Sequence, residues 1–374
     1  MATATAAKQG REGQLYQASQ WQLIWWRFRK HRVAVFSGGV LAFLYFIALF
    51  AEFIAPYDPA SFSPLYAFVP PQQVRVIDSE GNFRAPFVYS LARSRDTDTA
   101  RITYEPDPSI IVPLRFFVRG DDYKMWGLFR SDLHLFGIEA GPRGRVFLWG
   151  ADRLGRDLFS RLIYATRVSL SIGLLGVILS FVFGIIIGGI SGYYGGWIDN
   201  LIQRLIDFLR SIPTIPLWMG LAAALPVQWP PVRVYFLITL ILSIIGWTDL
   251  ARVVRGRFLA LREEDFVTAA RFVGAGEPRI IFRHMLPSFG SHIIAALTLA
   301  IPDMILAETS LSFLGLGLRS PVNSWGVLLQ EAQNLSSVAL APWLLIPGIA
   351  VVVTILAFNF LGDGLRDAAD PYGD

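Results

Sequence analysis

Long apolar runs separated by charged segments dominate the chain. An α-helix needs about 20 apolar residues to cross roughly 30 Å of hydrocarbon, and six runs approach or exceed this length. They lie at about residues 33–55, 168–193, 202–225, 232–250, 293–313 and 343–361. The pattern predicts an all-α polytopic membrane protein with about six transmembrane helices. The first run is too long for the core of a signal peptide, so we expect it to remain as an anchor.

The segment between the first two runs has a different pattern. Val74 and Val76 alternate with polar residues, residues 79–82 offer a turn, and residues 87–89 could return as a strand. Short β-branched and aromatic runs recur at residues 110–112 and 116–118. We therefore expect a small β-rich insertion over residues 56–150. It follows an N-terminal segment (1–32) and the first span (33–55), and precedes a core of five further spans (151–374).

Composition supports the membrane prediction and narrows the classes of function. The chain is 53% hydrophobic and only 17% charged, with a mean hydropathy of +0.47, whereas soluble domains carry roughly 25% charged residues. The net charge of +4 arises from basic residues beside the apolar runs, which favours membrane topology over nucleic-acid binding. The absence of cysteine excludes disulfides and thiolate metal ligands.

Basic residues in the short flanks of the apolar runs predict the orientation. The first run is preceded by Arg27, Arg29, Lys30 and Arg32, and such flanks stay in the cytoplasm. Counting spans from there places residues 252–287 and both termini in the cytoplasm, and the insertion outside. Residues 21–28 are rich in tryptophan, which favours an interfacial helix in contact with lipid before the first span.

The cytoplasmic segment 252–287 has the pattern of a helical hairpin. Phe266, Ala269, Ala270 and Val273 recur at i, i+3, i+4 and i+7, so we expect one apolar stripe on a short helix. The small alanines would let another protein approach the backbone closely. Gly274 permits a reversal before a second short helix. An amphipathic helix on anionic lipid would explain the arginines but not the alanine pair followed by a glycine hinge.

Residues inside the predicted spans offer further candidates. Four glycines at positions 184, 188, 192 and 196 would lie on one helical face, which favours close helix packing over a flexible gate. Prolines within or beside spans, at positions 213, 216, 302 and 347, predict kinks. The ionisable residues Asp207, Arg210, Asp303 and Glu308 are candidates for a functional pathway through the membrane. A helix-packing or interfacial role is the alternative for each.

The sequence shows no catalytic constellation. It lacks a Gly-x-x-x-x-Gly-Lys-Ser/Thr phosphate loop, so we do not expect this chain to bind ATP in that manner. The histidines at positions 31, 134, 284 and 292 lack the spacing of metal ligands. We therefore expect no cofactor, no metal and no enzymatic activity in this chain.

One motif resembles a known family. The run Thr-Ala-Ala-x-x-x-Gly-(nine residues)-His-x-Leu-Pro, residues 268–287, is similar to the coupling loop of bacterial ABC importer permeases. That loop usually has glutamate where this chain has Thr268 and isoleucine where it has His284. Residues 150–161, 308–317 and 358–367 resemble the second permease subunit of oligopeptide, dipeptide and nickel importers. The insertion is longer than expected for that branch.

The resemblance implies the type I ABC importer permease fold and a transport complex in which other subunits bind ATP and the substrate. It implies a homologous second permease subunit, two cytoplasmic ATPases that hold ATP and Mg²⁺, and a periplasmic or lipid-anchored substrate-binding protein. It implies a multi-pass protein of the bacterial inner membrane. The residues implied to couple to the ATPase are Glu264, Asp265, Phe266, Thr268, Ala269, Ala270, Arg271, Gly274, Ala275, Leu286 and Pro287.

The sequence leaves alternatives open for both class and substrate. A self-contained secondary transporter or channel would show an internal repeat and midplane coupling residues, and neither is visible. A membrane-anchored receptor would leave the hairpin unexplained. Peptides are the expected substrate class, while oligosaccharides, opines and metal chelates stay open.

Overall fold

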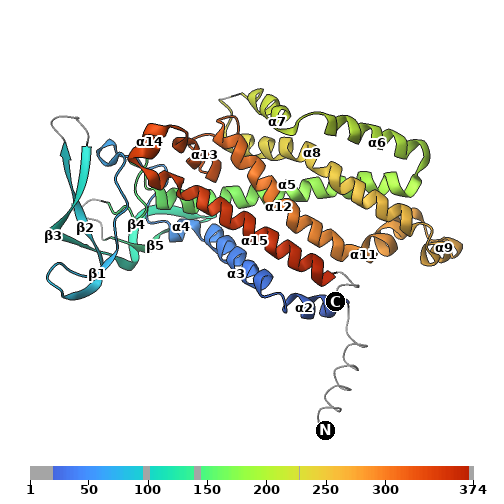
Figure 1. Ribbon diagram of the computed structural model, residues 1–374, viewed down its shortest axis with the longest axis horizontal. Helices are drawn as coiled ribbons and strands as arrows, with labels where there is room; N and C mark the ends of the chain where they lie inside the picture. The colour runs from blue at the N-terminus through green and yellow to red at the C-terminus, as the bar shows by residue number, and fades with distance from the viewer. Residues whose placement is uncertain (1–19, 96–101, 139–144, 227, 370–374) are drawn as a thin grey trace, which may run out of the picture.

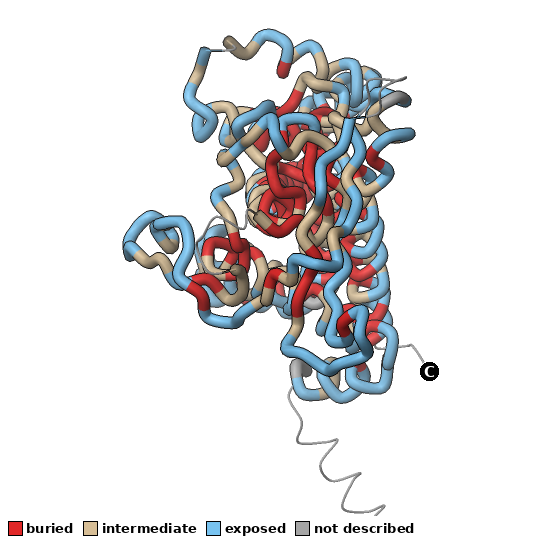
Figure 2. Tube along the Cα trace, turned by 90° about the vertical axis from the view of Figure 1, so that its left-hand side faces the viewer, coloured by how far each residue is buried: buried red, intermediate tan, exposed pale blue. Residues whose placement is uncertain are grey.

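The computed structural model describes residues 20–95, 102–138, 145–226 and 228–369. A long bundle of helices forms one part of the molecule, and two small sheets extend it at one end (Figure 1). Buried residues gather in the middle of the bundle, while its outer surface and much of the insertion are exposed (Figure 2). Part of the predicted N-terminal segment, residues 1–19, lies outside the described residues.

Five helical segments are long and apolar enough to cross a membrane in the part of the chain that the structure describes. They are Arg32–Leu49, Leu158–Tyr194, Pro231–Leu261, Ile293–Phe313 and Pro342–Ala369. The first three are α3, α5 and α8, the fourth belongs to α12 (Gly290–Phe313), and the fifth contains α15 (Ile346–Ala369). The shorter helices are α2 (Gln20–Phe28), α4 (Ala51–Ile54), α6 (Gly196–Ser211), α7 (Thr214–Ala223), α9 (Asp265–Phe272), α10 (Glu277–Arg279), α11 (Leu286–Ser288), α13 (Trp325–Gln330) and α14 (Leu335–Leu340).

The predicted third span is made in two pieces. Residues 202–225 are divided between α6 and α7, and the break falls at Ile212, whose backbone is extended before Pro213. Because α6 carries charges along one face, only the ten residues of α7 are apolar throughout. Together α6 and α7 return the chain from the end of α5 to the start of α8 (Figure 1). The kink predicted at Pro213 is thus a complete break, and the prediction of one apolar span is wrong, since the hydropathy average joined an amphipathic helix to a short apolar one.

Three ion pairs attach α6 to α8. The carboxylate of Asp199 accepts hydrogen bonds from Arg255 at 2.5 and 2.6 Å, and a further one from the hydroxyl of Ser191 on α5. Arg252 donates to Asp207 at 2.5 Å, and Arg210 pairs with Asp249. The first pair is largely buried, whereas the others are half-exposed. The pairs explain why an amphipathic helix lies here.

Glycines let α5 and α8 approach closely, with backbone contact at Gly188 and Gly192. A Cβ atom added at Gly184, Gly188 or Gly192 would lie within 2.4–2.9 Å of α8, against Leu250, Ala251 and Arg255 respectively. The packing prediction is therefore confirmed for these three positions. It is wrong for Gly196, which has a φ of +60° and begins α6 with nothing near its absent side chain.

The four prolines do not all act as predicted. Pro302 lies inside α12. Pro213 precedes α7, Pro216 falls in its first turn, and Pro347 is the second residue of α15. At the start of a helix a proline removes no internal hydrogen bond, so Pro216 and Pro347 fit without a kink, whereas Pro213 lies at the break between α6 and α7.

The described part of the insertion contains five antiparallel strands. A three-stranded sheet has the order β1 (Arg75–Ile77), β2 (Phe83–Arg95) and β3 (Ile102–Pro113), and a separate hairpin pairs β4 (Arg115–Met125) with β5 (Phe129–Gly137). The predicted β-rich insertion is confirmed. Of the alternating residues, Val76 lies in β1 and Val74 directly precedes it, while Val88 pairs with Val112 and both are buried in the larger sheet.

Gly188→Ala should destabilise the bundle. The new methyl group would lie 2.4 Å from the carbonyl oxygen of Ala251, so the helices must separate at a cost of about 1–3 kcal/mol. We expect a melting temperature several degrees lower in detergent. Gly39→Ala on α3 is the control, because nothing lies within 4 Å of that position. Equal melting temperatures for the two variants would refute close packing at Gly188.

Asp199→Asn should weaken the attachment of α6, at a cost of about 1–3 kcal/mol, because it leaves Arg255 without its charged partner. Asp207→Asn should cost at most about 1 kcal/mol, since its pair is exposed. Hydrogen bonds from Arg255 hold the pKa of Asp199 below its usual range. Its contribution is therefore complete above pH ~3.9 and is lost as the pH falls through the lower folded pKa. Unfolding midpoints from pH 7 downward measure this, and a difference between wild type and Asp199→Asn that does not shrink as the pH falls below ~3.9 would contradict it.

Candidate functional site

The segment 265–288 forms a helical hairpin, which we call the coupling hairpin. Gly274 ends α9 with a φ of +77°. The amide of Gly274 donates to the carbonyl of Arg271, and that of Ala275 to the carbonyl of Ala270, which is the hydrogen-bond pattern of a Schellman cap. A second helical stretch runs from Glu277 to Ser288. The predicted pair of short helices joined at Gly274 is confirmed.

The second arm contains a π-helical turn at Ile280–Met285. The amide of Leu286 donates to the carbonyl of Ile281, five residues earlier. A wider turn fits a proline that follows, because the ring of Pro287 would clash with the carbonyl four residues before it in a regular α-helix. Proline therefore shapes the end of the hairpin where it meets α12.

An apolar core fixes the coupling hairpin to three long helices. Val267, Ala270, Ile280 and Met285 are buried against Tyr193 of α5, Val254 and Phe258 of α8, and Phe289 and Ile293 at the start of α12. Two polar contacts add to it. The guanidinium of Arg271 lies 5.6 Å from the ring centre of Tyr193, and the hydroxyl of Tyr194 donates to Glu277 at 2.7 Å.

The opposite side of α9 is exposed and apolar. Phe266, Phe272 and Val273 are 40%, 87% and 84% exposed, and Ala269 is exposed beside them. The predicted single stripe is wrong in one respect, because Ala270 turns inward with Val267. Of the predicted coupling residues, Glu264, Asp265, Phe266, Thr268, Ala269, Arg271, Gly274 and Pro287 are exposed, Ala275 and Leu286 are half-buried, and Ala270 is buried.

A cavity of about 350 Å³, which we call the central cavity, lies inside the bundle between α5, α7, α8 and α12. Apolar side chains form most of its wall, among them Phe181, Trp218 and Met304. Two carboxylates, Asp249 and Asp303, also line it. Asp249 is paired with Arg210. Asp303 is exposed to the cavity and makes no hydrogen bond or ion pair with the residues that the structure describes.

The other predicted pathway residues lie elsewhere. Asp207 and Arg210 form ion pairs with α8. Glu308 is fully buried and accepts hydrogen bonds from Ser312 at 2.8 Å and Ser169 at 3.4 Å. These are the helix-packing contacts that the sequence left open as an alternative. The structure therefore places only Asp303 of the four on the cavity wall.

A buried charge cluster at the start of α5 escaped the sequence analysis. Asp152 and Arg161 are 0% and 1% exposed and bond to each other. Arg156 donates to Asp152 at 2.6 Å and to Glu331 at 2.7 Å, and Glu331 also accepts from Arg161 at 3.0 Å. The run 150–161 was visible as a motif, but its partner is about 170 residues away. The cluster locks the start of α5 to the segment after α13.

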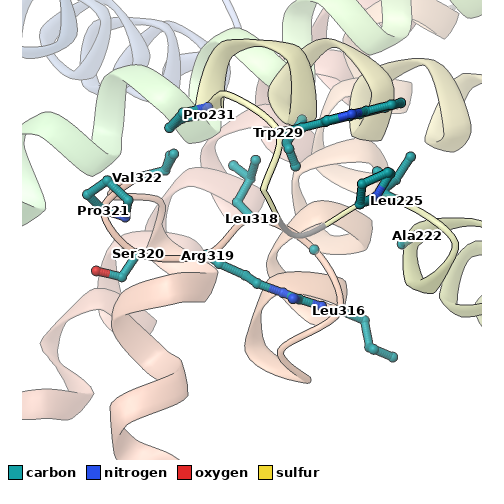
Figure 3. A pocket seen from close by; sticks show the side chains of 13 residues that line it. Ala222, Leu225, Trp229, Pro231, Leu316, Leu318, Arg319, Ser320, Pro321 and Val322 are labelled. Atoms are coloured by element: carbon teal, nitrogen blue, oxygen red, sulfur yellow. The ribbon is translucent and has the colours of Figure 1, made fainter.

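A second cavity of about 270 Å³ opens at the same end of the bundle. Residues of the α7–α8 connection, including Trp229 and Pro231, face residues 316–322 across it (Figure 3). Leu318 is fully buried at this contact. The cavity has an apolar wall with one cation, Arg319, among its lining residues.

Comparison with known proteins identifies the family. The family "binding-protein-dependent transport system inner membrane component" matches residues 181–372, and "N-terminal TM domain of oligopeptide transport permease C" matches residues 19–71. A solved inward-facing structure of the MetNI methionine ABC transporter has a TM-score of 0.43 and 18% sequence identity, and covers 56% of this chain and 97% of its own.

Three curated relatives illustrate the similarity. A glutathione transport system permease protein of Pectobacterium atrosepticum is 40% identical over 63% of this chain and 75% of its own. A dipeptide transport system permease protein of Alkalihalophilus pseudofirmus is 40% identical over 60% and 71%, and an oligopeptide transport system permease protein of Bacillus subtilis is 36% identical over 62% and 73%. The chain therefore belongs to the binding-protein-dependent transport system inner membrane components, the integral membrane permease subunits of ABC importers.

Proposed function

We propose that this chain forms half of the translocation pathway of an ATP-driven peptide importer, and that the coupling hairpin receives a partner ATPase. The observation that carries the proposal is the exposed apolar side of α9, which is held rigidly on a buried core. Phe272 and Val273 are almost fully exposed. Such a patch on a well-packed support is typical of a protein interface.

The proposed partners are those that the family implies. In this proposal two cytoplasmic ATPases supply the sites for ATP and Mg²⁺, and this chain contributes the coupling hairpin that they contact. A homologous second permease completes the pathway on the open side of the cavity. A periplasmic or lipid-anchored binding protein delivers the substrate at the end that carries the insertion.

The packing supports a mechanical mechanism. The coupling hairpin is fixed to Tyr193, Phe258 and Phe289, which belong to or directly precede α5, α8 and α12. The same three helices line the central cavity. A displacement of α9 by a moving ATPase is therefore transmitted to the cavity wall as a rigid-body movement, since packed interfaces shift between discrete arrangements and do not deform continuously.

The orientation follows from the basic flanks and the chain path. The described parts of both termini lie at the end of the bundle that carries α9 (Figure 1), and His31 lies 3.6 Å from Asp367 there. Arginines cluster at this end, in residues 27–32 and 252–283. By the positive-inside rule both termini and the coupling hairpin are cytoplasmic, and the insertion lies outside.

Peptides are the substrate class that we propose. The relatives are named for glutathione, dipeptide and oligopeptide transport. A mostly apolar cavity suits side chains of varied size. The carboxylate of Asp303, which has no partner among the described residues, offers an attractive charge for an α-ammonium group that passes.

Ala269→Glu should abolish transport without loss of insertion or fold. Ala269 is exposed on the apolar side of α9, so a carboxylate there would be desolvated without a partner when the ATPase docks. We expect the ATPase to be lost on copurification and uptake to fall at least about tenfold, which corresponds to about 1.4 kcal/mol. Ala92→Glu is the control, because Ala92 is exposed on β2 at the other end of the molecule. Normal copurification of the Ala269 variant would remove α9 from the interface.

Asp303→Asn tests the pathway independently of the ATPase interface. The change keeps the shape of the side chain and removes its charge, so we expect peptide uptake to fall about tenfold, or about 1.4 kcal/mol, while the ATPase still copurifies. Asp122→Asn, in the exposed part of β4, is the matched control. Uptake equal to that of the control would exclude Asp303 from the pathway.

A further inference from the structure

The tip of the β4–β5 hairpin is an exposed apolar loop. Met125 and Phe129 form its last cross-strand pair, and Trp126, Gly127 and Leu128 connect them. Trp126, Leu128 and Phe129 are 46%, 75% and 64% exposed. Trp126 also has a φ of +51°, which is uncommon for a residue with a large side chain. A water-exposed turn has no evident need for these residues.

Specific contacts hold this tip at the end of the first membrane-spanning helix. The indole nitrogen of Trp126 donates to the carbonyl of Leu49, the last residue of α3, at 2.8 Å, and its amide donates to Glu52 at 3.4 Å. Glu52 is in turn paired with Arg167 of α5. The indole ring lies 6.1 Å from the ring of Phe50. The tip therefore stays at the level where α3 leaves the membrane.

The exposed apolar surface continues from α3 to the tip. Phe43, Phe46 and Leu49 are 62%, 54% and 51% exposed along α3. Between α3, α5 and the tip lies an open cavity of about 520 Å³, whose lining residues include Leu49, Trp126 and Leu174. In Figure 1, α3 lies on the side of the bundle away from α6 and α7. This surface is thus separate from the α7 wall of the central cavity, where a second permease would close the pathway.

Charge complementarity favours lipid as the partner of the tip. Lys124 and Arg130 face each other across the two strands, one residue before the last pair, and both are exposed. Like charges placed directly opposite repel, and anionic lipid phosphates would relieve that repulsion. Tryptophan flanked by basic residues is the composition found where proteins meet the headgroup layer.

We propose that the β4–β5 tip inserts into the headgroup region of the leaflet that the insertion faces, and binds anionic phospholipid there. Trp126, Leu128 and Phe129 enter the apolar boundary, while Lys124 and Arg130 contact phosphates. The insertion is thereby fixed to both the bundle and the bilayer. The inference uses only the membrane location of the family, so it stands or falls separately from the proposed substrate and coupling.

Site-specific labelling tests this, because the chain has no cysteine. Leu128→Cys carries an environment-sensitive fluorophore, and the complete importer is reconstituted in vesicles of phosphatidylethanolamine and phosphatidylglycerol that contain nitroxide-labelled lipid. Phe83→Cys is the control, since Phe83 is an 82% exposed apolar residue at the start of β2. We expect lipid quenching at least about threefold stronger at position 128 than at position 83.

A second variant separates lipid from protein as the partner. In Leu128→Cys combined with Lys124→Glu and Arg130→Glu, quenching should fall and lose its dependence on phosphatidylglycerol. Equal quenching at positions 128 and 83 would overturn the proposal. So would a label at position 128 that is shielded from water without lipid quenching, because a protein subunit would then cover the tip. Uptake assays on the same vesicles report separately on transport.

Discussion

The contact between α5 and α8 is the constraint on which the bundle depends. Gly184, Gly188 and Gly192 leave no α5 side chain at the contact, so the backbones of the two helices meet at Gly188 and Gly192, and the side chain of Leu250 packs directly on Gly184. Apolar attraction gives no net drive for this contact in lipid, where close van der Waals packing has to supply it. The position of α8 in turn fixes α6 through the ion pairs, and fixes the coupling hairpin through Val254 and Phe258.

The same helix connects both ends of the molecule. At one end of α5, Arg161 belongs to the buried cluster with Asp152 and Glu331. At the other end, Tyr193 and Tyr194 contact the two arms of the coupling hairpin. A buried ion cluster breaks only at high cost, since a separated partner would remain as an unpaired buried charge. The start of α5 therefore moves together with the segment after α13, and not independently of it.

Local patterns predicted the elements, and distant pairings decided their details. The reversal at Gly274 and the strands of the insertion followed from glycine and from alternation, which act over a few residues. Pro213 predicted a kink in the third span, but the ion pairs that hold α6 as a separate amphipathic helix could not be predicted, because its partners lie on α8, about 40–60 residues away. The inward turn of Ala270 depends likewise on the position of Phe258. Glu331, which completes the buried cluster at the start of α5, is separated from Arg161 by 170 residues.

The charges of the bundle show which polar groups are structural. Asp199, Glu52 and Asp207 have arginine partners, and Glu308 is surrounded by hydroxyl groups. For Asp199, Glu52 and Glu308, which are buried, the cost of burial is thus offset by a specific contact. Asp303 differs, because it faces the cavity without a partner among the described residues. A carboxylate at membrane depth is costly to retain unless a solvated path or a passing cation satisfies it. The contrast with its paired neighbours distinguishes Asp303 from the packing residues, and it is the basis on which we propose Asp303 as a pathway residue.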